Sequence, residues 1–165
     1  PRALAFAELD RIPPDDLRRR AAECGGHPVA VLAAALGLPV DPADVATVAG
    51  VYHPHTPAPR AADAAVARLV AACGGTSDER TAARIGLLVQ ACDATSALVR
   101  SARDRGSEVH DVLRDDPPVR VTRRGDALVD LASAGLPFGA GAHACPGREH
   151  ALALAEGLLR HGEVR

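Results

Sequence analysis

Ten residues near the C-terminal end, FGAGAHACPG at 138–147, constrain this chain more than any other stretch. They place Cys145 at the end of a glycine-rich loop and directly before Pro146, a residue favoured at the first position of a helix. Residues 148–160 then show the apolar periodicity of a helix. The stretch therefore predicts Cys145 at a helix N-cap, where free backbone N–H groups and the helix dipole lower the pKa of a thiol. An anionic sulfur in an apolar setting is a soft ligand for a transition metal.

The same stretch resembles the haem-binding signature of the cytochrome P-450 superfamily, the haem-thiolate monooxygenases. The family pattern is Phe-x-x-Gly-x-His/Arg-x-Cys-x-Gly. It is matched at every specified position, by Phe138, Gly141, His143, Cys145 and Gly147. The resemblance implies that haem b is the cofactor and that Cys145 is both the ligand of its iron and a catalytic residue. It also implies that Gly139 is one of the loop residues that bind the haem.

Residues 87–96 resemble the distal helix of that family, whose pattern is Ala/Gly-Gly-x-Asp/Glu-Thr-Thr. Ala91 stands in place of the glycine, Asp93 keeps the acid, and Thr95 keeps only the second threonine because Ala94 replaces the first. The resemblance implies that Ala91 lines the haem and that Asp93 and Thr95 are catalytic, since the family uses its acid and threonine to relay protons. Ala94 argues against ordinary dioxygen activation and favours peroxide, isomerising or dehydrating chemistry. The alternative for Asp93 is a solvated helix face.

Two further blocks carry the resemblance. Residues 27–39 are similar to the helix that packs behind the distal helix, and residues 110–119 are similar to the acid–arginine helix, with Asp111 and Arg114 as an i,i+3 pair. Arg123 and Arg124 fall where the family binds a haem propionate; the alternative is a pair of exposed charges at the end of a strand.

With 165 residues, the chain has the size of one domain, 1–165. Its patterns predict a mainly α protein, a helical bundle with one small β-hairpin at 119–131. We expect a reduced haem-thiolate cytochrome fold, from a strongly truncated bacterial member or a fragment of one. The segments expected to be missing are most of the N-terminal sheet, the helix that clamps a propionate, the substrate lid and the meander.

Composition narrows the function classes. The formal net charge is −2, which gives no indication of nucleic acid or an anionic membrane as partner. No apolar run is expected to reach transmembrane length. The four cysteines lack zinc spacing and are predicted to be free thiols in a reducing cytoplasm. His53 and His55, in a proline-rich loop, are either metal or pocket residues or part of an exposed turn.

Two functions remain open at this point. The first is a haem-thiolate enzyme with oxidative, peroxide or isomerase chemistry on a small molecule of specialised metabolism, together with an electron donor. Its exposed haem edge would be covered by a second copy or another protein. The alternative is a haem-free relative, either an auxiliary protein or a repurposed non-redox enzyme in a biosynthetic pathway. A zinc site on Cys145 with His143 or His150 has the wrong spacing.

Overall fold

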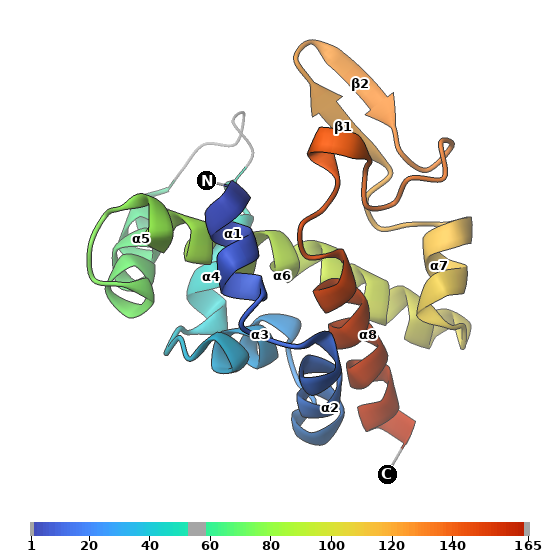
Figure 1. Ribbon diagram of the computed structural model, residues 1–165, viewed down its shortest axis with the longest axis horizontal. Helices are drawn as coiled ribbons and strands as arrows, with labels where there is room; N and C mark the ends of the chain where they lie inside the picture. Colours follow the sequence, from blue (N-terminus) through green and yellow to red (C-terminus); the bar gives the residue numbers. More distant parts are fainter. Residues whose placement is uncertain (1, 53–58, 164–165) are drawn as a thin grey trace.

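Residues 2–52 and 59–163 are described in the computed structural model of the chain (Figure 1). The helices are α1 (Arg2–Leu9), α2 (Pro14–Cys24), α3 (Pro28–Leu36), α4 (Pro42–Ala49), α5 (Arg60–Cys73), α6 (Glu79–Arg105), α7 (Val109–Asp115) and α8 (Arg148–Glu163). The strands are β1 (Val121–Arg124) and β2 (Ala127–Asp130), and a 3₁₀ turn covers Gly141–His143. The prediction of a mainly α chain with one small β-hairpin is confirmed.

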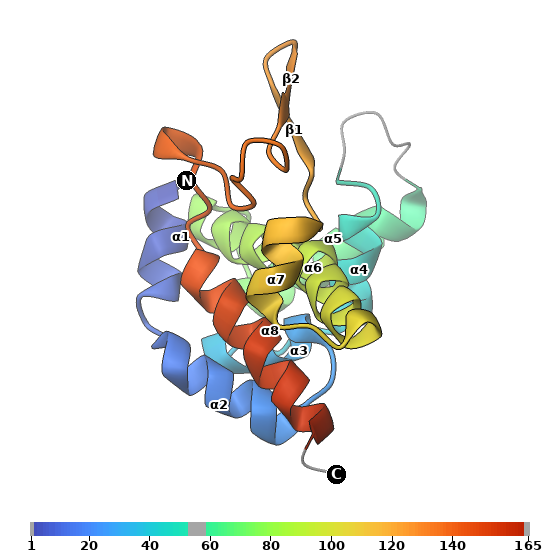
Figure 2. The same cartoon turned by 90° about the vertical axis from the view of Figure 1, so that its right-hand side faces the viewer.

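Helix α6 lies at the centre of the fold, with α1, α4 and α5 towards one end and α7 towards the other (Figures 1 and 2). It packs against all of these helices and also against α3 and α8. By length and composition, α6 is apolar enough to cross a membrane, which corrects the expectation that no segment approaches this length. Length and composition alone do not indicate a membrane span, because the central helix of a globular core has the same properties.

The core is filled almost entirely by Leu, Val and Ala side chains, as expected for a chain with only two Phe and one Tyr. Its largest fully buried side chains include Leu17, Leu69, Leu88, Leu154 and Leu158. Burial of this aliphatic surface is the main force that stabilises the fold.

Helices α2 and α8 make the most extensive contact between any two helices. A Cβ atom at Gly157 would lie 2.3 Å from the carbonyl oxygen of Arg18 and 2.7 Å from Cβ of Ala21, so this crossing needs a glycine. On the same interface, Arg18 Nε donates a hydrogen bond to Glu156 Oε2 at 2.7 Å. These contacts fix α8 and, with it, the loop that leads into α8.

Local sequence signals set most helix ends. The ring of His27 caps α3 by accepting a hydrogen bond from the Val29 N–H, and Gly37 ends that helix with a φ of 71°. The carboxylate of Asp78 caps α6 by accepting from the Thr81 N–H at 2.8 Å.

Helix α1 is the element that the sequence did not predict. A buried carboxylate holds it on α6: the side chain of Glu8 is only 3% exposed, and Arg80 Nε donates to its Oε1 at 2.7 Å. Arg84 Nε lies 3.1 Å from the same oxygen, and Arg11 donates to Oε2 at 2.8 Å. The position of α1 therefore depends on charges more than seventy residues away in the chain.

The hairpin projects from the helical body (Figures 1 and 2). Its strands pair in antiparallel register, with Val121 opposite Asp130 and Arg124 opposite Ala127. Nearly every residue of the two strands is exposed, including Leu128 at 67%.

Candidate functional site

The cysteine loop connects the hairpin to α8 and is closed by its own hydrogen bonds. The Cys145 N–H donates to the carbonyl of Phe138 at 2.7 Å, which brings the two ends of the loop together. Gly139 and Gly141 have φ values of 68° and 58°, in the left-handed region that favours glycine. A Cβ at Gly139 would lie 3.0 Å from the carbonyl oxygen of His143, whereas one at Gly141 would meet no atom within 4 Å. Gly139 thus serves the fold of the loop, and Gly141 leaves its outer surface open to a ligand.

Phe138 anchors the loop. Its half-buried ring packs against the hydrophobic core, and the guanidinium of Arg148 lies 5.7 Å from the ring centroid. His143 lies exposed in the 3₁₀ turn of the loop.

Helix α8 begins at Arg148, which corrects the prediction that Cys145 is its N-cap. The first helical hydrogen bond runs from the Ala151 N–H to the carbonyl of Gly147, because Pro146 and Gly147 form a turn that precedes the helix. Cys145 consequently stands two residues outside the position where the end of the helix would act on it most strongly.

The thiol of Cys145 is solvent-accessible, yet the protein packed around its sulfur raises its pKa by desolvation. A hydrogen bond from the Gly147 N–H and the charge of Arg2 oppose this increase without overcoming it. The predicted lowering of the pKa is therefore wrong for the protein without a ligand. A metal at the sulfur would displace the proton and reverse this balance.

Arg2 is a site residue that sequence reasoning missed. Its guanidinium donates a hydrogen bond to the carbonyl of Ala144 and stacks 5.4 Å from the ring centroid of Phe6. The contact joins the first turn of α1 to the residue before Cys145, across 142 positions of sequence. No local pattern could have identified it.

The three distal-segment residues take different positions on α6. Ala91 is half-buried against the core, Asp93 is exposed, and Thr95 is buried at 3% exposure. Two residues apart on a helix means a rotation of about 200°, so Asp93 and Thr95 point to nearly opposite sides. The structure does not bring this acid and this threonine together.

The arginines predicted to bind a haem propionate lie on the hairpin, and the predicted acid–arginine pair lies on α7. Arg123 and Arg124 are exposed on β1, and neither forms an ion pair with a carboxylate in the described part of the chain. Arg124 instead donates to Thr122 Oγ1 at 3.1 Å. The i,i+3 pair on α7 is confirmed, with 2.9 Å between Arg114 Nη1 and Asp111 Oδ1, although both side chains are solvent-exposed.

A cavity of about 810 Å³ lies beside the cysteine loop, between α6 and the helices α1, α4 and α5. Pro146, the residue after Cys145, forms part of its wall, and Gln90, next to Ala91, forms another part. The exposed surface of the wall is mostly apolar, and its charged residues are Arg2, Asp78 and Glu79. Its size falls in the range of small-molecule and cofactor pockets.

Two smaller cavities of about 360 and 300 Å³ lie elsewhere. The smaller one is lined by Phe138 and Gly139 together with residues of α7 and α8. Cys145, Asp93 and Thr95 are absent from the walls of all three cavities. The cavity of about 810 Å³ is thus lined by the sequence neighbours Pro146 and Gln90, and not by Cys145 or Ala91 themselves.

The loop with His53 and His55 lies outside the described residues. Within residues 2–52 and 59–163, no group of three or more His, Cys, Asp or Glu side chains is arranged to hold a metal ion. Comparison of the chain with protein-family models, with curated proteins and with solved structures found no match.

Proposed function

We propose that this chain is a haem-thiolate protein, similar to a reduced cytochrome P-450, that acts on a small molecule in bacterial specialised metabolism. One observation carries the proposal. An accessible cysteine stands at the end of a closed glycine loop, and the next residue forms the wall of an apolar cavity of about 810 Å³.

The residues present suit the cofactor. Haem b combines an iron that accepts a thiolate, a flat apolar ring and two carboxylates. Cys145 supplies the sulfur, and the open surface at Gly141 allows close approach of a ring. Arg2 contacts the cysteine loop at Ala144 and its charge acts on Cys145, so it would attract a carboxylate of a group bound there. His143, Arg123 and Arg124 are further exposed donors, and Ala91 offers a small side chain on the α6 side.

The haem would supply the redox or Lewis-acid chemistry. The chain would bind and orient the haem and the substrate, and it would adjust the electrostatics at the sulfur ligand. The Gly147 N–H and the Arg2 charge favour the anionic form of the Cys145 sulfur. The apolar wall between α4, α5 and α6 would exclude water from a bound substrate, with the Gln90 amide as a hydrogen-bonding group.

The positions of Asp93 and Thr95 favour one class of chemistry over another. Because they face opposite sides of α6, and because Ala94 has no hydroxyl, this pair offers no proton relay. Peroxide-type, isomerising or dehydrating reactions need no such relay, whereas dioxygen activation through an electron donor does. We therefore propose peroxide-type, isomerising or dehydrating chemistry ahead of a monooxygenase reaction.

A second candidate is a haem-free protein, either an auxiliary subunit or an enzyme that uses the apolar cavity for other chemistry. The raised pKa of Cys145 favours it, because a neutral thiol beside an apolar cavity is consistent with binding an uncharged ligand.

An absorption spectrum separates the two candidates. The purified chain is supplied with haem, reduced and exposed to carbon monoxide, and a thiolate ligand gives a distinctive long-wavelength Soret band. Cys145→Ser should remove this band, whereas Cys24→Ser, at an exposed cysteine on α2, should retain it. Absence of the band in the wild-type chain would overturn the haem proposal, and its persistence in Cys145→Ser would assign another ligand.

The proposed partners follow from the exposed surface. A second copy or another protein would cover the haem edge near the hairpin, where Leu128 and Val121 are at least half exposed. The mass in solution with haem bound tests this, and a strictly monomeric haem protein would refute it.

A further inference from the structure

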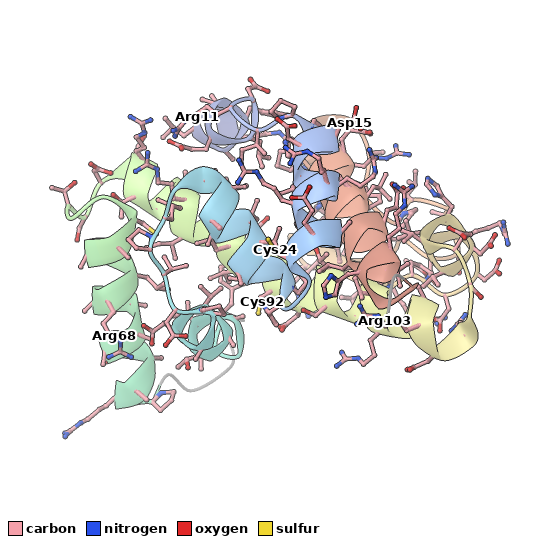
Figure 3. The ribbon with its side chains drawn as sticks, turned by 90° about the horizontal axis from the view of Figure 1, so that it is seen from below. Arg11, Asp15, Cys24, Arg68, Cys92 and Arg103 are labelled. Carbon is pink, nitrogen blue, oxygen red and sulfur yellow. The ribbon has the colours of Figure 1, made fainter. Side chains whose placement is uncertain are left out.

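A second cavity, of about 360 Å³, lies where α3 begins, beside the C-terminal half of α6 and the end of α8. Its wall includes Leu158, which is ten residues, or about 15 Å, along α8 from Arg148. Figure 3 shows Arg103, another wall residue, beside α8. The cavity is thus separate from the cysteine loop and from the cavity of about 810 Å³.

A histidine and a serine meet in this cavity: His27 Nε2 lies 3.4 Å from Ser96 Oγ. The other ring nitrogen, Nδ1, accepts a hydrogen bond from the Val29 N–H as the cap of α3. In neutral His27 the proton must therefore be on Nε2, which makes this nitrogen a donor towards Ser96. The pair cannot act as a base and its nucleophile, because the nitrogen facing the hydroxyl has no free lone pair.

The same arrangement makes Ser96 a donor towards the cavity. Since its oxygen accepts from His27, its hydroxyl hydrogen remains available, and no other hydrogen bond of Ser96 is found among the described residues. Two guanidinium groups add to this set. Arg100 has no ion pair within the described part of the chain, and Arg103 Nη2 donates to the carbonyl of Leu158 at 2.8 Å while keeping its other N–H groups.

The charges leave an excess of one positive unit in the wall. Arg100 and Arg103 each contribute a positive charge, and Asp104 contributes the one carboxylate among the wall residues. Gly26, at the rim, would meet no atom within 4 Å if it carried a Cβ, so the rim beside His27 is open. A cavity rich in donors, with net positive charge and an open rim, suits an oxyanion with several acceptor oxygens.

From this geometry we propose that the cavity formed by His27, Ser96, Arg100 and Arg103 is a binding site for a phosphate group. The guanidinium groups would bind two of its oxygens, and the Ser96 hydroxyl would bind a third. The site is independent of haem, and its occupation would stabilise the contact between α3, α6 and α8.

Titration calorimetry of the full chain without added haem tests the proposal, with inorganic phosphate as the first probe and phenyl phosphate as the second. We expect saturable binding of inorganic phosphate. Arg100→Gln should weaken it about tenfold, since a hydrogen bond to a charged group is lost, and Ser96→Ala should weaken it by a smaller factor. Arg60→Gln is the matched control, because Arg60 is another exposed arginine without an ion pair in the described residues, at the start of α5.

Tighter binding of phenyl phosphate would assign the phosphate group of a larger molecule, and equal binding would assign free phosphate; either result supports the site. No saturable binding up to about 10 mM phosphate would overturn the proposal. Equal weakening in Arg60→Gln and Arg100→Gln, or binding of acetate as tight as that of phosphate, would also overturn it. Circular dichroism confirms that each variant is folded before it is titrated.

Discussion

The buried carboxylate of Glu8 offers the sharpest test of how this fold is held together. Burial alone would raise the pKa of this group, but the hydrogen bond from Arg80, the close approach and charge of Arg84, and the hydrogen bond from Arg11 outweigh burial. The pKa therefore lies below its ordinary value of 4.5. Replacing Glu8 with Gln keeps the shape of the side chain and removes its charge.

The expected cost follows from the exposure of the three arginines. Breaking a fully buried ion pair costs about 3–5 kcal/mol, because a charge is left without a partner. Here Arg80 and Arg11 are 60% and 53% exposed and can return to water, so only Arg84, 17% exposed, is left poorly solvated. We therefore expect Glu8→Gln to lower the free energy of unfolding by about 2–3 kcal/mol at pH 7.

Urea denaturation measures this loss, which corresponds to a midpoint shift on the order of 1 M. Because the folded pKa of Glu8 lies below 4.5, its contribution is complete above that pH and is lost as the pH falls through the folded value. The difference between wild type and Glu8→Gln should therefore shrink below pH 4.5. Amide exchange in α1 should also become faster in the variant.

The control is Glu23→Gln on α2, where a carboxylate that is 60% exposed pairs with an exposed arginine. This substitution should leave the urea midpoint within experimental error. A change of less than about 0.5 kcal/mol for Glu8→Gln at pH 7, or a difference that does not vary with pH, would refute the assignment of Glu8 as the lock between α1 and α6.

Three further outcomes are expected. Gly157→Ala should lower the stability by about 1–3 kcal/mol, because its Cβ would overlap the carbonyl of Arg18, whereas Gly86→Ala, with no atom within 4 Å, should be neutral or slightly stabilising; thermal unfolding compares the two. A coloured disulfide reagent should react with two thiols in the native chain and four after denaturation, since two cysteines are exposed and two are buried; four fast thiols would contradict the core. Arg2→Gln should raise the pKa of Cys145, seen as a shift of its alkylation rate to higher pH, and an unchanged profile would contradict the contact.

The sequence predicted those parts of the fold that local chemistry determines. Helix α3 lies within residues 27–39, where the resemblance placed a helix, and the Asp111–Arg114 pair forms on α7. The turn of the hairpin at Gly125 also follows from residues within a few positions. In each case the signal and the structure that it determines lie in the same short segment.

The features that the sequence did not predict, or predicted wrongly, depend mostly on contacts between residues far apart in the chain. Helix α1 has no sequence signature of its own, because Glu8 finds its partners on α6, and Arg2 finds Ala144 near the other end of the chain. The pKa of Cys145 depends on how densely the folded chain surrounds the sulfur, a quantity that the spacing of loop residues does not contain. The start of α8 was misplaced because Pro146 can begin a helix or belong to a turn, and here Gly147 continues the turn.

The arrangement on α6 limits what the cysteine loop can be expected to do. Along a helix, successive residues rotate by about 100°, so Ala94 points between the exposed side of Asp93 and the buried side of Thr95. The hydroxyl of Thr95 lies on the buried side of α6 with Cys92, Leu98 and Val99, and it cannot reach the side on which Ala94 lies unless the whole helix rotates. Such a rotation would expose those side chains and break the contacts of α6 with α3 and α8. The packing of the core thus keeps the Thr95 hydroxyl away from the side of α6 on which Ala94 lies, so the reaction proposed for Cys145 is one that does not use Thr95.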